Sequence, residues 1–207
     1  MKKRYLTMSM VLLASFNYML LPAEYINSVT TSLEMSDAIP DQYAGLSAPQ
    51  SWNTFKSAYF TVYYLPQNDL KSIERKLRTR TLPSFGRNTY PDNVRSSAEK
   101  IAYRLDMLFI RTRELLDTYP DVHVNLRIFK TRQELDDEYY KIYKKGKDTA
   151  SFYVNKNKTI YVCESDLTDS LIVQEMARVI VDQDIGVILP AGIKNMFSSY
   201  VNSHLDE

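Results

Sequence analysis

The sequence has few of the residue types that carry most metal and nucleophilic chemistry. Its 207 residues include one cysteine, Cys163, and two histidines, His123 and His204. A single cysteine excludes an intrachain disulfide and a zinc cluster built on thiolates. Two histidines, one of them close to the C-terminus, offer little to a catalytic triad that needs an imidazole base. We expect Cys163 to be a small buried side chain in a strand and His123 to lie at the surface.

The chain also lacks an excess of charge of either sign. It has 26 lysines and arginines against 25 aspartates and glutamates, so its formal net charge is +1. Such a balance gives no general attraction to nucleic acid or to an acidic surface. Residues 70–88 are locally basic, but aromatic residues do not interleave with the charges as a nucleic-acid platform requires. We therefore expect a solvated helix and loop there, and no nucleic-acid partner.

The N-terminal residues have the pattern of an export signal. Lys2, Lys3 and Arg4 precede a largely apolar, uncharged run from Tyr5 to Leu21, and Ala23 is a small residue at a plausible cleavage position. This pattern predicts a signal peptide over residues 1–23, and hence a periplasmic or extracellular protein. The run is also just long enough to span a bilayer, so an uncleaved anchor is the alternative, and a membrane partner is expected only in that case.

Residues 24–57 are rich in serine, threonine and proline and predict a polar connector, which leaves residues 58–207 as the folded domain. Hydrophobic periodicity within that domain predicts an α+β order of elements. The expected elements are a strand at 59–65, a helix at 98–118, a strand at 122–128, a helix from the capping box at Thr131 to Gly146, a hairpin of 151–154 with 159–162, a helix capped by Thr168 or Asp169, a loop at 182–188 and a helix at 191–205.

The helix that begins near residue 169 contains Gln174-Glu175-Met176-Ala177-Arg178. This pentapeptide has the spacing of the zinc-peptidase motif H-E-x-x-H, with both histidines replaced. In the intact motif, two imidazoles at i and i+4 hold Zn²⁺ on one helix face, and the glutamate is the general base for the attacking water.

The order of elements, the strand Thr159-Ile160-Tyr161-Val162, this motif helix and the closing segment 189–200 together resemble the gluzincin-type zinc metallopeptidases. The resemblance is closest to the compact, exported, peptidase-MA-like proteins of bacteria. It implies a zincin-like α+β domain in which a small mixed sheet packs on the motif helix and further helices. It places the general base at Glu175 and the three zinc ligands at Gln174, Arg178 and Asn195.

Those three residues depart from the family pattern. Glutamine is a poor zinc ligand, and the guanidinium of arginine is always protonated and has no acceptor. We therefore expect that zinc has been lost, that the chain has no cofactor, and that Glu175 is a vestigial base. The resulting interpretation is an exported, catalytically inactive protein with a binding or scaffolding role, using Gln174, Arg178, Asn195 and Tyr161.

Two hypotheses follow for the altered site. Glu175 and Arg178 lie at i and i+3, so the guanidinium can pair with the carboxylate and occupy the space left by zinc. The strand Thr159–Val162 can take an extended peptide or protein segment by strand addition, as a sheet edge near the motif helix does in active relatives.

Three other interpretations are open at this point. The chain can be an active zinc peptidase or another hydrolase with unrecognised ligands. It can be a membrane-anchored structural protein, held by an uncleaved N-terminal helix. Residues 171–181 can also be an ordinary amphipathic helix in an unrelated α+β domain.

Overall fold

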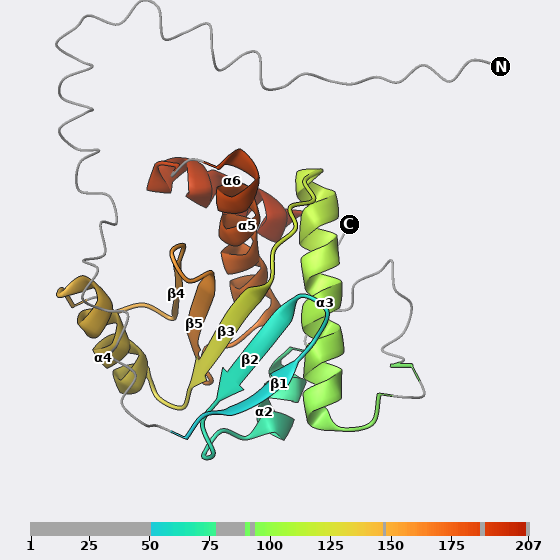
Figure 1. The fold of residues 1–207 in the computed structure, drawn as a ribbon, viewed down its shortest axis with the longest axis vertical. Coiled ribbons are helices and arrows are strands. Elements are labelled where there is room, and N and C mark those ends of the chain that lie inside the picture. The colour runs from blue at the N-terminus through green and yellow to red at the C-terminus, as the bar shows by residue number, and fades with distance from the viewer. Residues whose placement is uncertain (1–50, 78–89, 92–93, 147, 187–188, 206–207) are drawn as a thin grey trace, which may run out of the picture. The chain divides into compact units, whose positions relative to one another are not determined.

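The fold centres on one mixed sheet of five strands, in the order β1-β2-β3-β5-β4 (Figure 1). A computed structural model describes residues 51–77, 90–91, 94–146, 148–186 and 189–205. The expected signal peptide, most of the expected connector and much of the basic stretch lie outside these residues. The strands are β1 (Asn53–Lys56), β2 (Phe60–Tyr64), β3 (Val124–Phe129), β4 (Ser151–Val154) and β5 (Thr159–Cys163). Strands β2, β3 and β5 are parallel, and β1 and β4 run antiparallel to their neighbours at the two edges.

The sheet begins inside the segment that we expected to be connector. Strand β1 pairs with β2, and Phe55 packs against the main core beside Tyr64, with ring centroids 5.9 Å apart. The boundary at residue 58 is therefore too late. Strand β1 is short and three of its four residues are exposed, so it has little of the alternation by which a strand is recognised.

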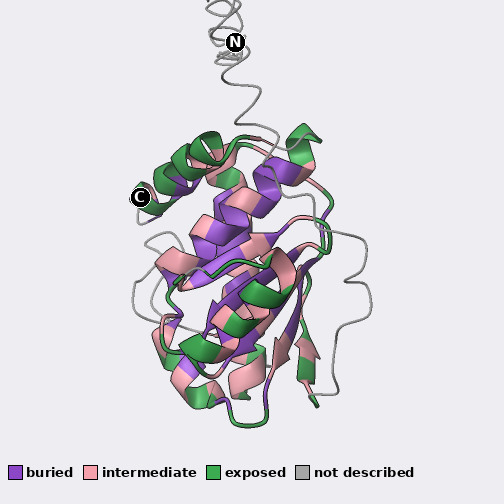
Figure 2. Cartoon of the chain, turned by 90° about the vertical axis from the view of Figure 1, so that its left-hand side faces the viewer, coloured by how far each residue is buried: buried purple, intermediate pink, exposed green. Residues whose placement is uncertain are grey.

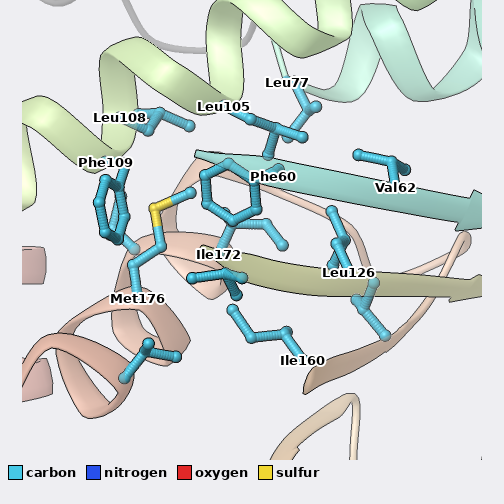
Figure 3. Packing of buried hydrophobic residues seen from close by; sticks show 14 of the residues in the cluster. Phe60, Val62, Leu77, Leu105, Leu108, Phe109, Leu126, Ile160, Ile172 and Met176 are labelled. Carbon is cyan, nitrogen blue, oxygen red and sulfur yellow. The ribbon is translucent and has the colours of Figure 1, made fainter. Parts of the chain in front are cut away.

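Five helices surround the sheet: α2 (Leu70–Lys76), α3 (Ser97–Leu116), α4 (Arg132–Tyr143), α5 (Asp169–Ile185) and α6 (Ala191–Ser203). Helices α3 and α5 lie on one side of the sheet and α4 on the other (Figure 1). Strand alternation sends Phe60, Val62, Leu126 and Ile160 to the side of α3 and α5, where they meet side chains such as Met176 (Figure 3). The main hydrophobic core therefore lies between the sheet and the motif helix.

Local capping signals explain where the helices begin. Ser96 with Glu99 and Thr131 with Glu134 form capping boxes at α3 and α4, and Thr168 caps α5, as its sequence predicts. The C-terminal ends were harder to predict. Helix α4 stops before Gly146, because Lys144 takes the left-handed conformation with φ 54°.

Helix α5 runs through residues 182–185, so our prediction of a loop from 182 to 188 is wrong. Asp182 is buried and pairs with Lys194 of α6 at 2.9 Å, which makes a charged residue compatible with a helix interior. The helix ends at Gly186, where φ is +68° and a glycine avoids the cost of a Cβ atom.

The opposite face of the sheet carries an aromatic layer. Tyr161 stacks on Phe152 with ring centroids 4.6 Å apart, and the Arg127 guanidinium lies 5.8 Å from the Tyr161 ring. Cys163 is buried in β5, and His123 is exposed beside Thr61, as expected. No helix in the described part of the chain is both long and apolar enough to cross a membrane.

Candidate functional site

The candidate site lies where the motif helix α5 meets the closing helix α6. The two helices lie side by side, and residues early in α5 meet residues late in α6 (Figure 1). Polar groups link them along their length: Ser170 with Asn202, the Gln174 carbonyl with the Ser198 hydroxyl, Arg178 with Asn195, and Asp182 with Lys194. The antiparallel arrangement brings the positions that correspond to zinc ligands on α5 and α6 to the same end of the helix pair.

Arg178 joins two of the predicted site residues. Its Nη1 donates to Glu175 Oε1 at 2.7 Å, and its Nη2 donates to Asn195 Oδ1 at 3.1 Å. The Glu175 side chain is 2% exposed and that of Arg178 is 28% exposed. The predicted Glu175–Arg178 pair therefore forms, with a buried anion and a partly solvated cation.

Ser151, which sequence reasoning missed, completes this group. Its hydroxyl donates to Glu175 Oε1 at 2.6 Å and so ties β4 to the motif helix. Glu175 Oε2 is buried and has no hydrogen-bond partner among the described residues. The only signal for Ser151 in the sequence is its place in a strand otherwise built of large side chains, which says nothing about a partner in a distant helix.

A second contact fixes the same hairpin to α5. The Tyr153 hydroxyl donates to Asn155 Oδ1 at 3.2 Å, and Gln183 Nε2 donates to the same oxygen at 3.1 Å. Burial, and then the carboxylate of Asp182, raise the pKa of Tyr153 above its ordinary value, and a hydrogen bond with Gln183 opposes them. The β4–β5 hairpin is thus held rigidly against the motif helix.

The structure does not bring the other predicted residues into this group. The Gln174 side chain donates to Ser170 Oγ at 3.3 Å, toward the start of α5 and away from Arg178. Tyr161 was expected near the motif, but it lies in the aromatic layer on the opposite face of the sheet. Strand alternation separates Tyr161 from its neighbour Ile160, and Ile160 is the residue that faces α5.

The hypothesis of strand addition at Thr159–Val162 is also wrong as stated. Strand β5 has β3 on one side and β4 on the other, so it has no free edge. The edge strand beside α5 is β4, and three of its four residues are buried. An extended partner therefore needs a different surface.

The residues at the expected metal position do not fit a zinc ion. The group contains one carboxylate, one amide and a guanidinium that stays protonated at any physiological pH. The guanidinium lies between Glu175 and Asn195 and repels a second cation. Zinc sites in proteins are built from imidazole, thiolate and carboxylate ligands, and Glu175 alone supplies one of these here.

Comparisons with models of protein families, with curated proteins and with solved structures found no match to this chain. The arguments about function therefore rest on the residues and on their geometry.

Proposed function

We propose that this chain is an exported, zincin-like domain that has lost its metal and its catalysis and that binds a polypeptide partner at the α5–α6 surface. The order of its elements supports the proposal: strand, long helix, strand, helix, hairpin, motif helix and closing helix follow each other as in gluzincin-type peptidases. The mixed sheet packed on α5 is consistent with the same layout.

One observation carries the proposal. A protonated guanidinium, rather than a metal ion, neutralises the carboxylate at the general-base position, through the 2.7 Å contact of Arg178 with Glu175. Water bound to zinc has a pKa of about 7, against about 15.7 in bulk, and hydrolysis depends on that shift. Arginine is a much weaker Lewis acid than zinc and cannot supply it, so the group is suited to holding a ligand and not to cleaving one.

The surface around Arg178 has the chemistry of a polypeptide-binding site. A guanidinium has five N–H donors, and the two bonds to Glu175 and Asn195 leave others directed at solvent. Amide and hydroxyl groups flank it along the helix pair, from Gln174, Asn195, Ser199 and Asn202. The Glu175–Arg178 pair has no net charge, which favours a neutral acceptor such as a backbone carbonyl over a second carboxylate.

The test uses the purified protein and reduced, carboxymethylated lactalbumin as an unfolded polypeptide. We expect no stoichiometric zinc by elemental analysis, no cleavage of the probe with added zinc, and saturable binding by fluorescence anisotropy. Arg178→Ala should weaken that binding at least fivefold, because it removes the exposed donors.

Arg75→Ala is the matched control, since Arg75 is an exposed arginine on α2 and should leave binding unchanged. About one zinc per chain together with cleavage would establish the active peptidase instead. Equal binding by wild type and Arg178→Ala would place the binding surface elsewhere.

A further inference from the structure

Helix α6 packs with its polar side inward. The side that meets α5 carries Lys194 in its ion pair with Asp182 and Ser198, which is 2% exposed, together with Val201. Large apolar side chains point the other way: Met196 is 72% exposed, Tyr200 46% and Ile193 38%. Exposed apolar side chains are common singly, but buried polar groups and exposed apolar ones on the same helix indicate that the outer side is a contact surface.

The exposed apolar residues form one continuous stripe. Ile193, Met196, Phe197 and Tyr200, here called the α6 stripe, have the spacing i, i+3, i+4 and i+7, which places them on one side of a helix over two turns. Exposed residues cover most of the visible surface of α6 near the C-terminus (Figure 2). Asn195 belongs to the other flank, which faces Arg178, so the stripe is separate from the candidate site.

We infer that the α6 stripe binds the α6 stripe of a second copy of this chain, in an antiparallel pair related by a two-fold axis. Charge is the first argument for this occupant. Lys194 is the only charged residue of α6, and Asp182 neutralises it within the chain. Two copies therefore meet without like-charge repulsion, whereas a partner with a charged rim finds no counter-charge on this helix.

Shape and size give the second argument. In an antiparallel pair centred between Met196 and Phe197, Ile193 of each copy lies near Tyr200 of the other, so the stripe is complementary to itself. A helix of 13 residues is about 20 Å long, and one side of it supplies less than the roughly 800 Å² per partner of a standard interface. The dimer is therefore weak, with a Kd of about 10–100 µM.

Sedimentation velocity of the purified protein from about 5 to about 500 µM tests this inference. Wild type should pass from monomer to dimer across that range, and Met196→Glu should weaken the dimer at least tenfold. Ser199→Glu adds the same charge to the same helix outside the stripe and should leave the dimer intact. Met196 and Ser199 are both exposed, so both variants should fold.

Oxidative cross-linking tests the two-fold geometry. The single native cysteine is buried, so Met196→Cys introduces one accessible thiol next to the predicted axis and should form a covalent dimer at least tenfold faster than Ser199→Cys. A protein that stays monomeric at about 500 µM would refute the inference, as would equal weakening by the two glutamate variants. Monomeric protein that instead sediments with phosphatidylcholine vesicles, through the same stripe, would also refute it and identify a lipid surface as the occupant.

Discussion

Replacing Arg178 with alanine is the most direct test of what holds the candidate site together. The change removes the only cation in contact with a carboxylate that is 2% exposed and leaves Ser151 as its single donor. Breaking a fully buried ion pair costs about 3–5 kcal/mol. Because Arg178 is 28% exposed, its interaction is partly screened, and we expect a loss of about 2–3 kcal/mol in the free energy of unfolding.

The reverse change should cost less. In Glu175→Gln, the Arg178 guanidinium keeps its contact with Asn195 and reaches water, so no buried charge is left without a partner. We expect a loss of about 1 kcal/mol, close to that of one ordinary hydrogen bond. The unequal costs of the two changes follow from the unequal burial of the two side chains.

A double-mutant cycle decides the cause. If an uncompensated carboxylate destabilises Arg178→Ala, adding Glu175→Gln should recover at least about 1 kcal/mol of stability. The assay is urea unfolding followed by circular dichroism, with equal m-values required for the comparison. In a thermal scan, Arg178→Ala should melt about 5–10 °C below wild type. A cost below about 0.5 kcal/mol, or a double variant as unstable as the sum of the single ones, would refute the reasoning.

Three further predictions concern the rest of the site and the core. Burial raises the pKa of Tyr153 above its ordinary value of 10.0, so the folded chain keeps the phenol proton after the unfolded chain has lost it; stability from this group is intact below about pH 10 and declines above it. Urea unfolding at about pH 8 and about pH 11 should show this decline in wild type and a smaller one in Tyr153→Phe, and equal declines would contradict the assignment. Cys163 is 0% exposed, so a thiol reagent should label it only at the rate of unfolding, and immediate labelling of native protein would show that β5 is open. The combined substitutions Gln174→His, Arg178→His and Asn195→Glu should restore a zinc site with about one ion per chain by elemental analysis, and failure to bind zinc in a folded protein would count against the zincin-like layout.

Periodicity and capping predicted most of the elements because those signals are local. Thr131 and Thr168 mark helix starts with side-chain bonds to residues only a few positions away. The pairing of Glu175 with Arg178 was likewise predictable, since both residues lie on one helix turn.

The errors concern relations between distant segments. Alternation shows that Ile160 and Tyr161 face opposite sides of the sheet, but it does not show which side carries α5. Strand order is also a property of the whole fold, so the position of β5 inside the sheet was not available from the hairpin alone. The same holds for the end of α5, where the buried Asp182 depends on a lysine from the next helix.

The mixed sheet has a consequence for how the chain reaches this structure. Its only local strand pairs are the β1–β2 and β4–β5 hairpins, whereas β3 must join β2 and β5 from separate parts of the chain. Hairpins form within about 1–10 µs, but parallel pairs must first pay the closure entropy of the long segments between them. Strand β3 is therefore the late step that unites two early hairpins, and slowing its arrival should leave their inner edges exposed to aggregation.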